Sequence, residues 1–305
     1  MSVSRVRIPC MVIALFVSSM AWAQLPTKQS NAGDSMSQAA FADGWPGEYP
    51  ELSWVQGTSG DVYSIFLRYR ELVPSFTQQP ESVSGAEMVG GSNSFAAQAG
   101  RICAQEEKPR HVSVLLGAND VCNRPRSSSS DATANMYSLE TWVNALRAGL
   151  DQLAACLPPG ATVHVLSFPR VDYLYQAGRA KGFWCNYVVW PSAGICRIVT
   201  EETNASRRAR IGARINEYNE ATRAEVQLYD SNADGRNPRG VRFVSDWQGS
   251  IEDGYGNTSI GTYIFGASDI NGTDCFHPST QAQRKLACMA WASNPDGSGA
   301  VRDCF

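Results

Sequence analysis

Three short, largely apolar runs stand out along the chain and predict buried strands. They are Val112–Leu116, Val163–Phe168 and Val241–Val244. Each run is short and mostly apolar, with one or two polar residues in it, which is typical of the buried strands of a parallel sheet. Because each run is also much shorter than an ordinary helix, the pattern favours strands of a parallel sheet over buried helices.

Longer segments between and after these runs carry apolar residues at helical spacing and predict amphipathic helices. They are Ser94–Ala104, Leu139–Leu157, Arg207–Gln227 and Gln281–Ala292. Strands that alternate with helices predict an α/β fold, a flavodoxin-like three-layer α/β/α sandwich around a central parallel sheet. In such sheets ligands bind beyond the carboxyl ends of the strands, so the residues that follow each strand are candidates for chemistry.

Residues 1–23 have the layout of a secretory signal peptide. Arg5 and Arg7 give a basic start, Ile8–Val17 is almost entirely apolar, and Ala21–Ala23 is a small-x-small cleavage sequence. The apolar run is shorter than the roughly 20 residues that span a bilayer as a helix. We therefore expect cleavage before Gln24, a secreted or periplasmic location and no stable membrane insertion.

The remaining residues, 24–305, have the size of one large domain. The formal net charge of the whole chain is −3, and it becomes −5 without the two arginines of the signal peptide. This acidic balance gives no indication of nucleic-acid binding, and it does not point to an anionic membrane either. We expect a monomer whose partner is an ester substrate.

Eight cysteines remain after the signal peptide, and an even number in an exported chain predicts four disulfides. Many pairings are possible, so the count alone does not choose among them. Short-range closure favours Cys185–Cys196 and Cys288–Cys304. A zinc site is not favoured, because the chain has only three histidines and no Cys-x-x-Cys pair.

Short polar motifs lie where several of the predicted strands end. Gly33–Met36 reads Gly-Asp-Ser-Met, and Ser84–Ala86 reads Ser-Gly-Ala. The strand at Val112–Leu116 runs into Gly117–Asp120, which reads Gly-Ala-Asn-Asp. Asp274–Ser279 reads Asp-Cys-Phe-His-Pro-Ser. Each motif is common by itself, but their joint occurrence in this order is a strong signal.

The set of motifs resembles the SGNH (GDSL-type) hydrolases, in particular their secreted esterase and phospholipase-B-like branch. Those proteins carry a Gly-Asp-Ser block, a later Gly block, a Gly-x-Asn-Asp block and a final Asp-x-x-His block. Ser53–Arg68 and Tyr218-Asn219 also match, so the resemblance covers nearly all of residues 24–305. Two segments depart from it: Pro26–Ala32 is polar where an apolar first strand is usual, and Ser82–Met88 matches the second block only loosely. The first departure predicts a short or irregular strand before Ser35.

The resemblance implies a serine hydrolase with Ser35, His277 and Asp274 as its catalytic residues. A serine hydroxyl is a weak nucleophile at neutral pH and needs an adjacent base. A carboxylate hydrogen-bonded to that base holds the imidazole in the required tautomer, and Asp274 and His277 are close enough in sequence for one loop to carry both. The other histidines, His111 and His164, begin or lie within predicted strands and are expected to be structural.

By the same resemblance, the oxyanion is bound by the backbone N–H groups of Ser35 and Gly85 and by the side-chain amide of Asn119. A glycine at position 85 leaves room for a substrate to approach the backbone. Asp34 is expected to be a structural, hydrogen-bonding residue. The mechanism implies no metal ion and no organic cofactor.

Two cysteines flank this expected site, because Cys122 follows Asn119 closely and Cys275 precedes His277. A Cys122–Cys275 disulfide would fix the loop that carries the base. Cys103–Cys156 would then remain as the fourth pair.

The segment Tyr173–Cys196 is rich in aromatic residues and shows little periodicity. It is too long for an ordinary connection between elements. Two interpretations stay open: a substrate wall or lid beside the active site, or a disulfide-closed surface loop that packs on itself.

These observations predict a secreted carboxylic ester hydrolase that acts on a small-molecule, lipid or glycan ester through an acyl-enzyme on Ser35. Two alternatives stay open. An enzyme of the same fold can transfer an acyl group or deacetylate cell-surface glycans, and a decayed hydrolase fold can serve as a non-catalytic binding protein.

Overall fold

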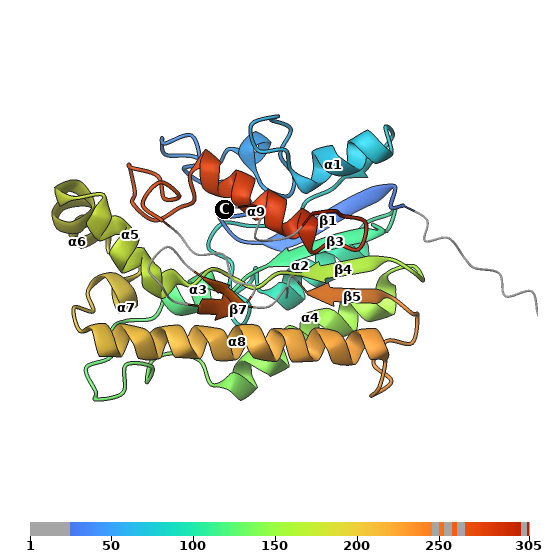
Figure 1. The fold of residues 1–305 in the computed structure, drawn as a ribbon. Coiled ribbons are helices and arrows are strands. Elements are labelled where there is room, and N and C mark those ends of the chain that lie inside the picture. Colours follow the sequence, from blue (N-terminus) through green and yellow to red (C-terminus); the bar gives the residue numbers. More distant parts are fainter. Residues whose placement is uncertain (1–24, 246–249, 253–257, 261–265, 300–303, 305) are drawn as a thin grey trace, which may run out of the picture.

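A five-stranded parallel sheet forms the centre of the structure, a computed structural model that describes residues 25–245, 250–252, 258–260, 266–299 and 304 (Figure 1). The strand order is β2-β1-β3-β4-β5. The strands are β1 (Lys28–Gly33), β2 (Thr77–Gln78), β3 (His111–Leu115), β4 (Thr162–Val165) and β5 (Arg242–Ser245). A separate antiparallel pair is formed by β6 (Ser250–Glu252) and β7 (Thr258–Ile260). The expected signal peptide, residues 1–23, lies outside the described residues.

Helices cover both faces of this sheet, as the alternating pattern predicts (Figure 1). One face is covered by α2 (Phe95–Ala104), α4 (Leu139–Cys156) and α8 (Ala205–Ser231). The other face is covered by α1 (Ile65–Leu72) and α9 (Thr280–Ala292). The remaining helical elements lie mainly at the carboxyl ends of the strands: α3 (Ala118–Cys122), α5 (Leu174–Ala180), α6 (Trp190–Ala193), α7 (Arg197–Thr200), a π-helix (Trp184–Val189) and 3-10 turns at Pro50–Leu52 and Val171–Tyr173. The three-layer α/β/α sandwich is confirmed.

Hydrogen-bonding side chains fix where the long helices begin. Ser64, Ser94, Ser138 and Ser279 are the N-caps of α1, α2, α4 and α9, and each accepts a hydrogen bond from a backbone N–H of the first helical turn. Such caps satisfy donors that have no partner within the helix. The four predicted helices are confirmed, with boundaries that differ by a few residues at most. Along the described chain, no helix has the length and apolar character needed to cross a membrane.

The strand that precedes Ser35 is regular, which corrects the expectation of a short or irregular one. β1 pairs in parallel with β3 along five consecutive residues and is buried throughout. Its polar side chains are buried because each has a hydrogen-bond partner. Lys28 donates to Glu107 O (2.7 Å), Gln29 to Val55 O (2.9 Å), Ser30 to Gln79 O (2.6 Å) and Asn31 to Ser82 Oγ (3.1 Å). A strand can therefore lie at the centre of the sheet without an apolar sequence.

Four disulfides link the described chain, and two of the expected pairs are present. Cys103–Cys156 joins α2 to α4, and Cys288–Cys304 joins α9 to the C-terminal end. The other two expected pairs, Cys122–Cys275 and Cys185–Cys196, are wrong. The structure pairs Cys122 with Cys196 and Cys185 with Cys275, across sequence separations of 74 and 90 residues.

The exchange of partners has a structural reason. Residues between Cys185 and Cys196 are helical and end in a left-handed turn at Gly194 (φ 63°), so the two cysteines face different neighbours. Cys196 begins α7, which packs against α3 and hence against Cys122. Short sequence separation is a poor guide when the intervening residues are helical rather than a flexible loop.

Two buried histidines lie between the sheet and α9, and both are structural as expected. His111 contacts Tyr69 Oη (3.3 Å) and Ser113 Oγ (3.1 Å), and His164 Nε2 contacts Ser293 Oγ (3.0 Å). Burial lowers the pKa of His111 to about 3, helped by the nearby His164, and burial lowers the pKa of His164 to about 4. Both imidazoles are therefore neutral at pH 7.

These shifts predict a loss of stability in acid. The unfolded chain gains a proton on each imidazole near pH 6.5, whereas the folded chain gains it only near pH 3 to 4. Stability is thus fully present above about pH 6.5 and is lost as the pH falls. We expect His164→Gln to reduce the loss between pH 7 and pH 5 by about 2 kcal/mol. Urea unfolding at each pH measures it, and parallel curves for the two proteins would contradict the assignment.

Candidate active site

Ser35 lies in a tight turn immediately after β1. The backbone N–H groups of Ser37 and Gln38 donate to the carbonyl oxygen of Asp34 (3.0 and 3.1 Å), which folds the chain back directly beyond the strand. A Cβ at Gly33 would lie 2.2 Å from Ser37 Oγ, so only glycine fits before this turn. The side chain of Ser35 is held at the carboxyl edge of the sheet.

Two glutamines fasten this turn to the helices on opposite faces of the sheet. Gln98 of α2 accepts from the Gly33 N–H (2.7 Å) and donates to the Gly33 carbonyl (3.0 Å). Gln283 of α9 donates to the Met36 carbonyl (2.9 Å) and accepts from the Trp54 N–H (2.9 Å). The backbone around Ser35 is therefore fixed from both sides by neutral hydrogen bonds.

The loop before α9 brings His277 to Ser35. His277 Nε2 lies 2.9 Å from Ser35 Oγ, and His277 Nδ1 is hydrogen-bonded to Asp274 Oδ2. The ring of Phe41 stacks on the imidazole, with ring centroids 5.4 Å apart and planes 6° apart. The three residues singled out from the sequence form one continuous chain of hydrogen bonds, and the Phe41 ring covers one face of its central member.

Asp274 is held by several donors from its own loop. Its Oδ1 accepts from the N–H groups of Phe276 (3.0 Å) and His277 (3.1 Å), and also from the Asn271 side chain. Burial alone would raise the pKa of Asp274, but the hydrogen bond and charge of His277 and these N–H donors outweigh it and hold the pKa below its ordinary value. Asp274 therefore stays ionised and can stabilise a positive imidazolium.

The candidate oxyanion donors belong to three segments: the turn after β1, the segment of Gly85 and the first turn of α3. Asn119 lies in the first turn of α3, and its Nδ2 donates to Ala86 O (3.0 Å). Within the described chain, the backbone N–H groups of Ser35 and Gly85 have no hydrogen-bond acceptor. Gly85 has a φ of 80°, and a Cβ there would meet nothing within 4 Å, so the residue faces open space. The Asn119–Ala86 bond holds the glycine segment against the strand end that carries α3.

Asn119 owes its position to the glycine before the helix. Gly117 has a φ of 135°, and a Cβ there would lie 2.3 Å from a ring carbon of Phe168. Any other residue would displace either the ring or the first turn of α3. The motif therefore needs glycine two residues before Asn119, because the backbone of Gly117 lies directly against the Phe168 ring.

Two other carboxyl groups near the site are structural. Asp34 Oδ1 accepts from the Met36 N–H (2.9 Å), and Asp120 accepts from the N–H groups of Met88 (2.6 Å) and Val89 (2.9 Å). Burial raises the pKa of each carboxyl to about 7, although the N–H donors oppose the rise. Asp34 is thus used for the turn after β1, as expected, and Asp120 fixes the segment that follows Gly85.

A small pocket opens at Ser35. It is lined by Ser35, Met36, Ala118, Asn119, Val171, Leu174, Phe276 and Pro278. Apart from Ser35 and Asn119 the lining is apolar, and the centre of a water-sized sphere has only about 10 Å³ to move in. That space is close to the minimum for a single water molecule. The pocket therefore suits a group of very few carbon atoms.

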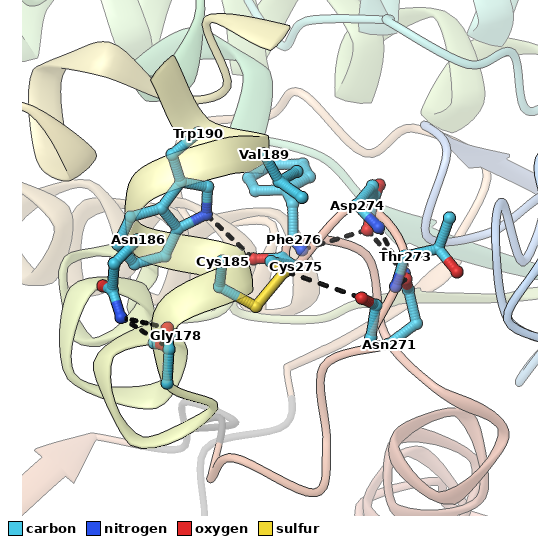
Figure 2. Close-up of a disulfide and its surroundings, with 12 residues drawn as sticks. Gly178, Cys185, Asn186, Val189, Trp190, Asn271, Thr273, Asp274, Cys275 and Phe276 are labelled. Carbon is cyan, nitrogen blue, oxygen red and sulfur yellow. Dashed lines mark hydrogen bonds between the residues drawn. A yellow bond between two sulfur atoms is a disulfide. The ribbon is translucent and has the colours of Figure 1, made fainter. Parts of the chain in front are cut away.

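The aromatic segment expected as a loop is helical. Residues 174–193, here called the arm, comprise α5, the π-helix and α6. The Cys185–Cys275 disulfide joins the arm to the loop of Asp274 and His277, and Trp190 Nε1 donates to the Cys275 carbonyl (3.2 Å) (Figure 2). Leu174, at the start of the arm, lines the pocket. The base of the arm is therefore a wall of the site, which agrees with the first interpretation, a substrate wall or lid, rather than with a surface loop that packs on itself.

The model of the family GDSL-like Lipase/Acylhydrolase matches residues 31–288, which include Ser35, Gly85, Asn119, Asp274 and His277. The chain belongs to this family. As a GDSL acylhydrolase it is a carboxylic ester hydrolase. A search of curated proteins gives no match.

Solved structures with a similar fold include two hydrolases. LAE5, described as an alpha/beta hydrolase from the metagenome of Lake Arreo, Spain, is 15% identical, with 88% of this chain and 94% of that chain covered and a TM-score of 0.43. Axe2, an acetylxylan esterase from Geobacillus stearothermophilus, is 14% identical, with 87% and 92% covered and a TM-score of 0.45. Both similarities extend over most of the GDSL chain.

Several residues of the site were not predicted from the sequence. Gln98, Phe41 and Asn271 position the turn, the imidazole and the carboxylate, and Val171 and Leu174 line the pocket. Of these residues, only Gln98 could have been suspected from the sequence, because it is a polar residue within the apolar stripe of a predicted helix. The described residues contain no group of three or more His, Cys, Asp or Glu side chains arranged to hold a metal ion.

Proposed function

We propose that this chain is an exported serine esterase in which Ser35, His277 and Asp274 form a catalytic triad acting on short-chain acyl esters. The observation that carries the proposal is the hydrogen-bond chain from Ser35 Oγ to His277 Nε2 (2.9 Å) and from His277 Nδ1 to Asp274. This is the arrangement that lets a serine lose its proton while it attacks a carbonyl.

The acylation step follows from these contacts. Ser35 Oγ attacks the ester carbonyl carbon while its proton moves to His277 Nε2, which must be neutral to receive it. The imidazolium that forms is stabilised by the ionised Asp274. As the tetrahedral intermediate collapses, the bond to the alcohol oxygen breaks and His277 returns the proton to that oxygen. The acyl group is left as an ester on Ser35.

Deacylation repeats the sequence with water. His277 takes a proton from the water molecule as the water oxygen attacks the acyl carbon, and then gives it back to Ser35 Oγ as the acid leaves. Negative charge on the carbonyl oxygen develops in both steps. We assign its stabilisation to the N–H groups of Ser35 and Gly85, which have no acceptor among the described residues, and to the Asn119 amide.

Preference for a short acyl group rests on the pocket. Leu174 and Phe276 stand among its apolar lining residues, and between them the centre of a water-sized sphere can move through only about 10 Å³. An acetyl or similarly small group fits such a space, whereas a long chain would require these side chains to move. Export is supported by residues 1–23 and by the four disulfides, which persist in oxidising compartments.

Active-site labelling tests this function. The secreted protein is treated with a fluorophosphonate probe, and the labelled peptide is identified by mass spectrometry. We expect a single adduct on Ser35, which disappears in Ser35→Ala. On p-nitrophenyl esters from acetyl to palmitoyl, we expect kcat/KM to fall at least about tenfold beyond the shortest chains, because each buried methylene that does not fit loses transition-state binding. Absence of labelling, or labelling elsewhere, would overturn the proposal and favour a non-catalytic binding protein.

A further inference from the structure

Exposed aromatic side chains of the described chain gather beside the active-site loop. Phe183, Trp184 and Tyr187 have exposed fractions of 72%, 53% and 62%, and Trp45 has 69%. The first three lie on the arm, and Trp45 lies in a loop whose Gly44 carbonyl accepts a hydrogen bond from Thr273. Large exposed aromatic groups are unusual unless they contact a partner.

The arm presents its three aromatic residues on a rigid support. Gly178 of α5 packs directly under Trp190, where a Cβ would lie 2.0 Å from the indole ring. The Asn186 side chain donates to the carbonyls of Gly178 (3.3 Å) and Gly182 (2.6 Å), which closes the hairpin (Figure 2). The disulfide of Cys185 then anchors it. The exposed rings are therefore held out in a fixed orientation rather than on a flexible loop.

The charge of the arm is opposite to that of the whole protein. From residue 173 to residue 200 the sequence contains no Asp or Glu, although the chain has a net charge of −3. Arg179 and Lys181 lie in this stretch, and neither forms an ion pair with a described residue. Arg208 of α8 stacks on Tyr175 of the arm at 3.8 Å and adds a third cation. Arg197 is paired with Glu201 and contributes little.

We propose that the arm tip, defined as Arg179, Lys181, Phe183, Trp184 and Tyr187, binds the surface of an anionic phospholipid bilayer. Phe183 and Tyr187 contact each other, with ring centroids 5.2 Å apart, so they form one apolar face beside the two cations. Apolar rings with flanking Arg and Lys are the composition that binds the interfacial region of a membrane. The proposed binding is peripheral, because the tip is expected to enter only the interfacial region of the bilayer.

A neutral polysaccharide fits the tip less well. Recognition of a sugar ring needs several polar side chains that converge on its hydroxyl groups. The acid-free arm contains two side-chain amides, Gln176 and Asn186, and that of Asn186 is already used within the hairpin. For the membrane proposal, Trp45 can be compared with the aromatic residues of the arm tip. It is similarly exposed, but its loop carries Asp43 and Glu48, which an anionic surface repels.

Binding at the tip would bring the site to the membrane surface. The base of the arm lines the pocket through Leu174, and the disulfide joins its centre to the residue two positions before His277. Esters at or near the bilayer would then be presented to Ser35 at high local concentration. Soluble esters reach the same site without the membrane, so the surface and the hydrolytic function can be tested separately.

Vesicle partitioning tests the proposal. The secreted protein is sedimented with vesicles of phosphatidylcholine alone and with vesicles that also contain phosphatidylglycerol, at low and at high salt. We expect binding to the anionic vesicles that weakens as salt screens the charges. Each basic residue near an anionic surface changes affinity about fivefold, so Arg179→Glu with Lys181→Glu should reduce partitioning at least about 25-fold. Phe183→Ser with Trp184→Ser should reduce it by about tenfold or more.

Matched controls make each outcome decisive. Arg239→Glu reverses one positive charge at the opposite end of the sheet, half the charge change of the double variant, and Trp45→Ala removes a similarly exposed ring; both should leave partitioning nearly unchanged. Hydrolysis of p-nitrophenyl acetate should be equal in all these variants, which shows that the fold is intact. The proposal is overturned if anionic vesicles are not bound, if the control variants lose binding equally, or if the protein is retained by an insoluble polysaccharide instead.

Discussion

Replacing Ser35 by alanine should lower kcat/KM on a short-chain ester by at least about 10⁴-fold, because the nucleophile is lost while the fold is kept. Among the described residues, Ser35 Oγ is hydrogen-bonded to His277 alone, so the substitution removes one hydroxyl and leaves the Gln98 and Gln283 contacts of the turn in place. Steady-state hydrolysis of p-nitrophenyl acetate measures the effect. Thermal unfolding of the same preparation should differ from that of the parent protein by only a few degrees.

Ser37 provides the matched control for this substitution. It lies two residues further along the same turn and is fully buried, but its hydroxyl has no hydrogen-bond partner among the described residues. Ser37→Ala should therefore keep most of the activity. If Ser35→Ala retained activity within about tenfold of the parent, water attack or another nucleophile would be required and the triad would be wrong.

Replacing Asn119 by alanine is the second large expected effect. Loss of one oxyanion donor costs about 10²–10³ in kcat in hydrolases of this kind, and KM should change little because the interaction strengthens only in the transition state. The substitution also removes the bond to Ala86 O (3.0 Å), which holds the segment of Gly85. A separate loss of stability of about 1 kcal/mol is therefore expected as well.

Two measurements separate these roles of Asn119. Asn123→Ala, at the end of the same helix, removes an amide that donates to Glu87 (2.8 Å) and should leave kcat within about twofold. A transition-state analogue such as a boronic acid should bind Asn119→Ala about 10²-fold more weakly, in step with kcat. Unchanged analogue affinity with a raised KM would show that Asn119 binds substrate in the ground state instead.

The apolar pattern predicts only those strands that lie within largely apolar runs of the sequence. β3 and β4 follow that rule, and the sequence identifies both within a few residues. β1 does not, because Gln29, Ser30 and Asn31 satisfy their polar groups with partners that lie far along the chain. Such partners are unknown before the fold is known, so the strand that carries Ser35 could be placed only through its motif.

The site itself was predictable to the extent that each role needs a particular residue type. A nucleophile, a base and a carboxylate leave a recognisable spacing, and Ser35, His277 and Asp274 do meet in the structure. Residues that act by packing leave no such mark. Leu174 could be replaced in sequence by any apolar residue, and its place in the pocket depends on how the arm folds.

The disulfides show the same limit for long-range contacts. Nothing in the sequence near Cys185 distinguishes Cys196 from Cys275 as a partner, and the choice is made by helices that turn one cysteine toward the His277 loop. Correct pairing therefore follows from the folded arm rather than preceding it.

The hydrogen bond between Ser35 and His277 joins residues 242 positions apart, nearly the full length of the chain. Gln283 reinforces the same connection by bonding to Met36 and Trp54 near the other end. During synthesis Ser35 is therefore made early, and His277 is added only after most of the chain has been made. If His277 is the base, a chain that stops before it should not hydrolyse esters, so activity is expected only after synthesis has passed this residue.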